Sequence, residues 1–286
     1  MKKLVAIDLD GTLLSSNLDI SKRNITAIQK AEREGHIIMI CSGRAPEDIK
    51  EVLKDTPLQC PIAGSNGTIV EVNGSRLLEV SIDKQGVKNV ANILNENNFP
   101  FKVYTNKGIF IEANFTDRMK VLLDENESIK NHFSANQIKL MTEQPKETEM
   151  LKFFESIDDI LQLENISIQK FFIATFVGKE ALISLLKEKV ENIVITTSGP
   201  YNIEIMDTNG NKGNALKLMA EHYNVPIENT IAIGDNFNDL PMLEQAGFSI
   251  AMENGDPTIK ERASAITTAN DEDGVASAIE KYVLNH

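Results

Sequence analysis

The strongest structural signal in this chain is the stretch Val5-Ala6-Ile7-Asp8-Leu9-Asp10-Gly11-Thr12-Leu13-Leu14. Its apolar start predicts a buried parallel strand, because such strands are covered on both faces. Asp8 and Asp10 follow where this strand ends, at the edge of an open α/β sheet where ligands bind. Two neighbouring carboxylates repel each other, and Mg²⁺, which prefers oxygen ligands, would relieve that repulsion. The alternative is an ordinary strand-end turn in which the aspartates only cap a helix.

A second apolar run ends in polar residues of a different kind. The run over 37–41 leads directly into Ser42-Gly43-Arg44. A hydroxyl group and a flexible glycine at a strand end suit a phosphate cradle made of backbone N–H groups and the serine side chain. The alternative is a plain strand-to-helix turn that Ser42 caps.

Two further motifs lie nearer the C-terminus, and the first of them repeats this design. The run over 230–234 delivers Asp235 as a third metal ligand, and Asp239 follows one helical turn later, where it can brace the site. Acidic residues that favour a helix N-terminus are the alternative. Lys212 stands between two glycines just before a helical run over 214–222, and from there it can reach into a cleft and neutralise phosphate. The alternative for Lys212 is a solvated surface residue.

The order of the expected elements divides the chain into two domains. Strand and helix alternate over 1–81 and again over 208–286, which predicts one parallel-sheet domain. Hairpins mixed with helices over 82–207 predict an inserted α+β domain with a largely antiparallel sheet. The fold class is therefore α/β, a Rossmann-like core interrupted by an inserted domain. Within the insertion we expect helices over 83–97, 148–161 and 179–190 and strands over 101–105, 109–112, 171–177, 193–197 and 202–205.

Composition limits the classes of function. The chain has 286 residues with 29 basic and 42 acidic side chains, a net charge of −13, which argues against binding to nucleic acid or anionic membranes. No apolar run approaches the ~20 residues of a membrane span, and no signal segment is visible, so a cytoplasmic protein is expected. Cys41 and Cys60 are expected to be buried free thiols of a reducing compartment. A nucleophilic Cys41 is the alternative, although no motif places a histidine beside it.

Taken in this order, the motifs resemble those of the haloacid-dehalogenase-like (HAD) hydrolase superfamily. The matches are D-x-D-G-T at 8–12, S-G-R at 42–44, K-G at 212–213 and G-D-x-x-N-D at 234–239. The chain is most similar to the Cof-type phosphatase branch, which carries a large inserted cap of type IIB. The segments 66–68 and 270–275 also match that branch, and the resemblance spans the whole chain.

The resemblance implies a role for each motif residue. Asp8 attacks phosphorus and forms an aspartyl-phosphate, and Asp10 serves as the acid and then the base. Mg²⁺ is held by Asp8, the backbone carbonyl of Asp10 and Asp235, with Asp239 bracing the site. The phosphoryl group is held by the side chains or amides of Leu9, Ser42, Gly43, Arg44, Lys212 and Asn238.

The expected function is therefore a Mg²⁺-dependent phosphatase for small phosphorylated metabolites, acting as a monomer or a small homo-oligomer. A phosphotransferase or mutase with the same intermediate remains open, as does a non-enzymatic protein that binds a phosphorylated ligand. The cap is expected to choose the leaving group, with Tyr104, Glu204 and Asp207 as candidate contacts. The sequence leaves the physiological substrate open.

Overall fold

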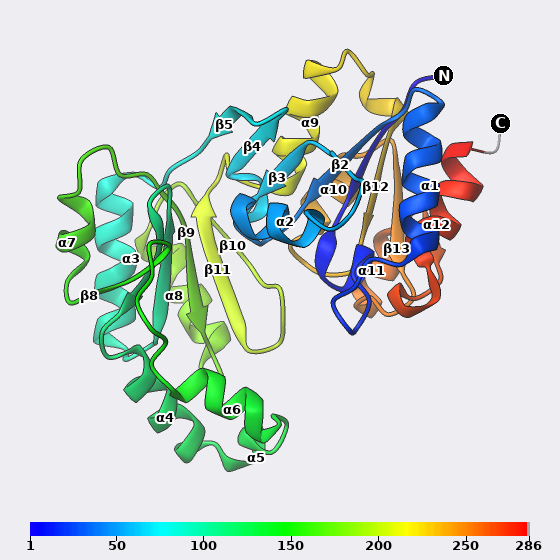
Figure 1. Ribbon diagram of the computed structural model, residues 1–286. Helices are drawn as coiled ribbons and strands as arrows, with labels where there is room; N and C mark the ends of the chain where they lie inside the picture. The colour runs from blue at the N-terminus through cyan, green and yellow to red at the C-terminus, as the bar shows by residue number, and fades with distance from the viewer. Residues whose placement is uncertain (285–286) are drawn as a thin grey trace. The chain divides into compact units, whose positions relative to one another are not determined.

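The computed structural model describes residues 1–284, which form two compact units (Figure 1). The first unit contains Met1–Glu79 and the segment from Asn209 onward, and the second contains Val80–Thr208. The sequence prediction put the limits of the insertion at 82 and 207. Each unit has its own sheet and its own hydrophobic clusters, so each is described by itself.

The first unit is built on an eight-stranded sheet with the order β14-β13-β12-β1-β2-β3-β4-β5. The strands from β14 to β3 run parallel, and β4 and β5 add an antiparallel edge. From β1 the chain builds the sheet in one direction, and from β12 it builds in the other. The strands are β1 (Leu4–Ile7), β2 (Ile37–Cys41), β3 (Ile62–Gly64), β4 (Ile69–Val72), β5 (Ser75–Glu79), β12 (Thr230–Gly234), β13 (Phe248–Met252) and β14 (Ala265–Thr267).

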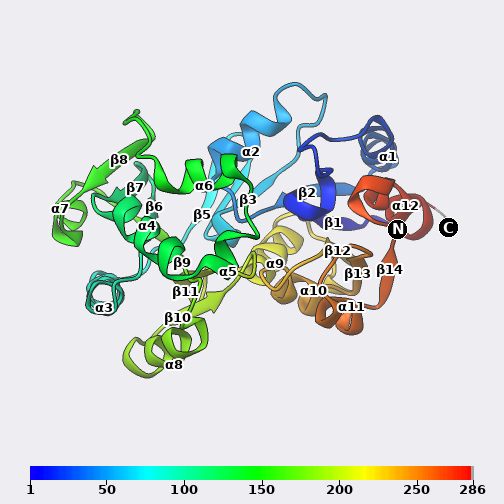
Figure 2. The same cartoon turned by 90° about the horizontal axis from the view of Figure 1, so that it is seen from below.

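Helices cover both faces of this sheet, which explains why its central strands are apolar throughout. Alternate residues of β1 show this: Val5 and Ile7 pack on one face and Leu4 and Ala6 on the other. The first face is covered by α1 (Lys22–Arg33), α2 (Pro46–Leu53) and α12 (Gly274–Ile279), and the second by α9 (Lys212–His222), α10 (Leu240–Gln245) and α11 (Pro257–Arg262). Figure 2 shows the two layers on either side of the strands.

The second unit has a six-stranded sheet with the order β10-β11-β9-β6-β7-β8, antiparallel except for the pair β7 and β8. Helices α3, α7 and α8 pack on one face and α4 and α6 on the other. The strands are β6 (Phe101–Thr105), β7 (Gly108–Glu112), β8 (Leu151–Phe154), β9 (Ile168–Ala174), β10 (Ile193–Thr196) and β11 (Asn202–Asp207). The helices are α3 (Lys84–Glu96), α4 (Phe115–Glu125), α5 (Glu127–Lys130), α6 (Ala135–Thr142), α7 (Ile157–Leu161) and α8 (Lys179–Lys189).

The single helix predicted over 148–161 is wrong, because its first half is the edge strand β8. Leu151 and Phe153 pack towards α4 and α6, whereas Phe154 joins the cluster on the opposite face. This alternation is the period of a strand, and β7 supplies the hydrogen-bonding partner. The helix begins only after Ser156, whose hydroxyl accepts a hydrogen bond from the Asp158 N–H at 3.3 Å.

The predicted fold class is confirmed: a parallel-sheet core is interrupted by an inserted α+β unit. The reversal of strand order between β12 and β1 is the kind of switch point at which open α/β sheets bind ligands. No helix within residues 1–284 is long and apolar enough to cross a membrane.

Candidate active site

A buried lysine and two aspartates form the centre of the candidate site. Asp8 directly follows β1 and is 4% exposed, and Lys212, the first residue of α9, is completely buried. The Lys212 ammonium donates to Asp8 Oδ1 at 2.5 Å and to Asp239 Oδ1 at 2.6 Å. Asp239 Oδ2 accepts from the N–H groups of Asp235 and Asn236, so both of its oxygens are engaged. Asp239 thus fixes both the lysine and the turn that follows β12.

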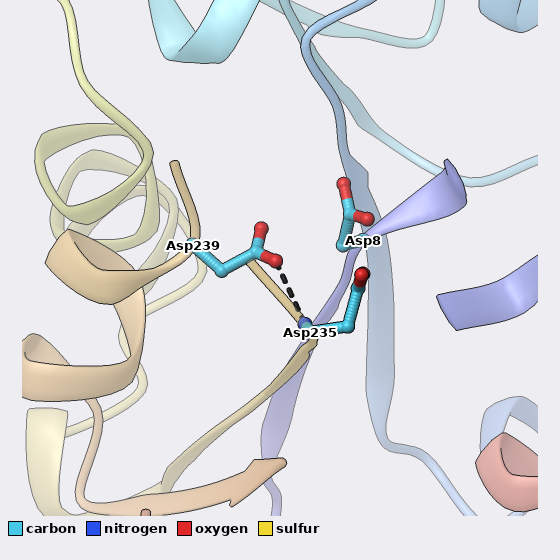
Figure 3. Close-up of side chains that lie close together, drawn as sticks. All are labelled: Asp8, Asp235 and Asp239. Carbon is cyan, nitrogen blue, oxygen red and sulfur yellow. Dashed lines mark hydrogen bonds between the residues drawn. The ribbon is translucent and has the colours of Figure 1, made fainter. Parts of the chain in front are cut away.

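Asp235 completes a group of three carboxylates. Figure 3 shows Asp8, Asp235 and Asp239 turned towards a common space, with the hydrogen bond from the Asp235 N–H to Asp239 drawn as a dashed line. One carboxylate oxygen from each residue lies within 4.8 Å of the others. The Thr12 hydroxyl donates to Asp235 Oδ1 at 2.8 Å. Asp235 is therefore oriented by a side chain from the turn that follows β1.

Gly11 is required in that same turn for two reasons. Its φ of +78° lies in the left-handed region, which side chains of L-residues rarely adopt. A Cβ atom at this position would also lie 2.6 Å from Asp235 Oδ2. The glycine of the D-x-D-G-T motif therefore makes room for the carboxylate that comes from β12.

The charges of this group suit a bound cation. Burial, followed by repulsion from Asp239, raises the pKa of Asp235 to about 6, and the same two causes raise the pKa of Asp8 well above its usual value. For Lys212, burial disfavours the charged form, but Asp239 and Asp8 outweigh it and raise its pKa. One ammonium group does not balance three carboxylates. The lone pairs left on Asp8 and Asp235 are the hard oxygen donors that Mg²⁺ takes.

Asp10 and Arg44 pair with each other at the same edge of the sheet. The Arg44 Nε and terminal NH2 donate to the two oxygens of Asp10 at 2.8 and 2.5 Å. The Asp10 side chain is 50% exposed and lies outside the three-carboxylate group. Sequence reasoning assigned Asp10 to proton transfer and Arg44 to phosphate, but it did not foresee that each holds the other.

The remaining phosphate candidates gather after β2. Ser42 is completely buried, and its hydroxyl accepts a hydrogen bond from the Arg44 N–H at 3.2 Å. A Cβ on Gly43 would lie 3.1 Å from the amide oxygen of Asn66, which itself accepts from Asn238 Nδ2 at 3.2 Å. Leu9 is buried beside Asp8.

Sequence reasoning assigned no role to Asn66 or Thr12, although both lie inside matched motifs. The signal for Asn66 is its position two residues after the third strand of the same parallel sheet, where the carboxyl ends of neighbouring strands meet.

The remaining candidates from the sequence are Cys41, Tyr104, Glu204 and Asp207. Burial raises the pKa of Cys41 to about 12, which keeps the thiol protonated and argues against a nucleophilic role. In the second unit, Glu204 accepts a hydrogen bond from Lys170 at 2.8 Å, and the Lys170 ammonium lies 4.5 Å from the centre of the Tyr104 ring. Two of the three predicted contact residues thus share Lys170, which the sequence did not single out. Asp207 is partly exposed at the end of β11.

Comparison with known proteins finds relatives that match almost the whole chain. The family model of the haloacid dehalogenase-like hydrolases matches residues 5–279. Phosphatase YwpJ of Bacillus subtilis is 32% identical over 99% of this chain and 100% of its own length. The 5-amino-6-(5-phospho-D-ribitylamino)uracil phosphatase YwtE of the same organism is 33% identical over 98% of both chains.

Solved structures share the fold. A haloacid dehalogenase-like hydrolase from B. subtilis superposes with a TM-score of 0.83 at 29% identity, covering 98% of this chain and 99% of its own. A subclass IIB sugar phosphatase has the same fold, with a TM-score of 0.79 at 18% identity, covering 99% of this chain and 100% of its own. The protein therefore belongs to the haloacid dehalogenase-like hydrolase family, among its phosphatases.

Proposed function

We propose that the protein is a Mg²⁺-dependent phosphatase that hydrolyses small phosphomonoesters through an aspartyl-phosphate on Asp8. The observation that carries this proposal is the buried Asp8 carboxylate, held by Lys212 at 2.5 Å and grouped with Asp235 at the ends of β1 and β12. A carboxylate fixed in this way is oriented for attack and shielded from bulk water. An aspartate that only caps a helix needs neither the lysine nor the second carboxylate.

The first half-reaction transfers the phosphoryl group to Asp8. A carboxylate oxygen of Asp8 forms a bond to phosphorus while the bond from phosphorus to the leaving oxygen breaks. Asp10 gives its proton to that leaving oxygen, which departs as an alcohol. Both Asp10 oxygens accept from Arg44 in the structure, so Asp10 must turn from Arg44 to the substrate for this step.

The second half-reaction restores the enzyme. Asp10, now a carboxylate, takes a proton from a water molecule while the water oxygen attacks phosphorus. The bond between phosphorus and the Asp8 oxygen breaks, inorganic phosphate leaves, and both residues return to their starting states.

Charge on the phosphoryl group must be offset throughout. Mg²⁺, when bound by Asp8 and Asp235, offsets the repulsion between the phosphoryl group and the Asp8 carboxylate. The Asp10 backbone carbonyl is the proposed third protein ligand, and Asp239 keeps Lys212 and the Asp235 turn in place. Lys212, Ser42 and Asn238 donate to the phosphoryl oxygens, together with the amides of Leu9 and Gly43 and the Arg44 guanidinium.

The substrate is proposed at the level of a class, and the inserted unit is proposed to select it. The relatives named as phosphatases of a ribitylaminouracil phosphate and the fold shared with a sugar phosphatase support phosphorylated sugars or sugar-like chains. The two buried, unbridged cysteines among the described residues support a cytoplasmic setting.

The test is phosphate release from a panel of sugar phosphates, the ribitylaminouracil phosphate and nucleotides, each with Mg²⁺ or with chelator. We expect release that depends on Mg²⁺ and concentrates on related compounds, and acid-quenched samples should carry phosphate on the Asp8 peptide. A phosphotransferase would instead phosphorylate an added sugar without releasing phosphate. A folded protein that releases and transfers none would be a binding protein, and the proposal would be wrong.

A further inference from the structure

A cavity lies entirely within the inserted unit. Its volume is about 340 Å³, in the range of sites for small organic ligands. Strands β6 and β9 form its floor, and α4 and α6 form its walls, on the sheet face that these helices cover. None of its lining residues belongs to the candidate active site.

One lysine in the lining of this cavity has no carboxylate partner among the described residues. Lys102 on β6 lies 4.9 Å from the centre of the Phe115 ring, and both residues line the cavity. Lys102 is partly buried, which lowers its pKa, and it forms no ion pair with a carboxylate of residues 1–284. By contrast, the fully buried Lys170 and Lys212 are each bonded to a carboxylate. A partly desolvated ammonium group without a counterion favours the binding of an anion.

The lining of the cavity matches an anion with an aromatic body. None of the described lining residues is acidic, although the chain carries a net charge of −13. Phe133, Phe176 and Tyr201 form one wall, with ring centres 5.4–5.8 Å apart. Such rings offer flat apolar surfaces and polar edges to a planar molecule.

A second lysine fixes the turn that closes the cavity. The Lys179 ammonium donates to the Thr197 hydroxyl at 3.0 Å and to the carbonyls of Gly199 and Pro200 at 3.1 and 3.3 Å. Gly199, Pro200 and Tyr201 all line the cavity, so the aromatic wall stands on a turn that is already ordered.

We propose that this cavity binds a small aromatic carboxylate, with the carboxylate on Lys102 and the ring against Phe133, Phe176 and Tyr201. The site uses no residue of the phosphatase centre, so it stands whether or not the proposed reaction is correct. The bound carboxylate supplies the counterion that Lys102 lacks, and the ring of the ligand displaces water from an apolar surface.

Calorimetry on the full-length protein with 2-naphthoate and the neutral 2-naphthamide tests this site. The two probes share a shape and differ in charge. We expect wild type to bind naphthoate more tightly and K102M to weaken naphthoate binding by about tenfold while leaving naphthamide binding unchanged. K152M is the matched control, because Lys152 also lies over a ring, 5.6 Å from the centre of Phe110, but outside the cavity lining. Its naphthoate affinity should stay at the wild-type value.

Three outcomes would overturn the proposal: equal binding of the two probes by wild type, an unchanged naphthoate affinity in K102M, or no saturable binding. The first and third need no variant and so do not depend on whether a mutant folds. A second variant, A174L, fills the floor of the cavity while keeping Lys102 and should weaken both probes, with thermal unfolding to confirm that it is folded.

Discussion

At the scale of single residues, Asp8 is the clearest case of a side chain that lowers the stability of the folded protein and serves the proposed reaction. Its carboxylate is buried beside Asp239 and Asp235, which raises its pKa. We expect Asp8→Asn to abolish phosphate release while leaving the free energy of unfolding of the metal-free protein unchanged or higher, because one repelling charge is removed. Phosphate release and urea unfolding in chelator measure the two effects. Asp117→Asn, at an exposed position, should change neither, and wild-type turnover in Asp8→Asn would exclude the covalent mechanism.

Lys212, unlike Asp8, stabilises the folded protein, because it neutralises buried carboxylates. Lys212→Met keeps the length of the side chain but leaves Asp8 and Asp239 buried without their cation. Breaking a buried pair in this way costs about 3–5 kcal/mol, and activity should be lost as well. Urea unfolding measures the loss. Lys88→Met removes only an exposed pair with Asp158 and is the control, so equal stability of the two variants would contradict the assigned role.

The raised pKa of Asp235 predicts how pH and Mg²⁺ act together. The folded pKa is about 6, above that of the unfolded chain, so the folded metal-free protein binds more protons between about pH 4 and pH 6. The contribution of Asp235 to stability is therefore fully present below this window and is lost as pH rises through it. Mg²⁺ needs the ionised carboxylates and should raise the melting temperature more at pH 7.5 than at pH 5. An equal rise at both pH values would show that Asp235 does not hold the metal.

Residue types at strand ends made Asp8 and Asp235 predictable, since a buried strand places whatever follows it at the ligand-binding edge. Lys212 was predictable from its position between glycines at the start of a helix. The pairing of Asp10 with Arg44 was not, because it depends on two side-chain rotamers that no spacing specifies. Thr12 orients Asp235 across the sheet, and sequence separation hides such a contact. The sequence thus predicted which of these residues lie together, but not the hydrogen bonds between them.

At the scale of elements, the turn after β1 has to pass close to the end of β12. Gly11→Ala places a Cβ against Asp235 and also strains a left-handed backbone. Gly35→Ala is the matched control, since its φ is +89° but nothing lies within 4 Å of the added Cβ. Both variants should lose about 1–2 kcal/mol from backbone strain, and only Gly11→Ala should also lose phosphate release and Mg²⁺-induced stabilisation. An active Gly11→Ala enzyme would show that Asp235 tolerates displacement.

Helices and strands that depend only on local sequence signals lie close to where the sequence predicted them, whereas β8 does not. Helix α3 begins after Asp83, whose side chain accepts from the N–H groups of Gln85 and Gly86, a signal visible in the sequence. The segment Leu151–Phe154 contains lysine and aromatic residues that suit a helix as well as a strand. Its state is decided by β7, which offers an open edge to it. Such a tertiary choice cannot be read from a local pattern.

At the scale of the whole molecule, the inserted unit has the properties of an independent domain. The clusters around Phe101 and Phe115 contain only residues from within 80–208, and the clusters of the first unit contain only residues outside that range. The change from strand–helix alternation to hairpins made the insertion visible in the sequence, because parallel and antiparallel sheets need different connections.

If folding of the insertion depends only on its own core, the segment 80–208 should fold when expressed alone. We expect a cooperative urea transition by far-UV circular dichroism, with a denaturant slope in proportion to its size. The shorter segment 80–150 lacks β9, which pairs with both β6 and β11, and should show no cooperative transition. An unfolded 80–208 would mean that the first unit supplies part of its stability. The two units would then form one cooperative body, and substitutions in either would change the unfolding of both.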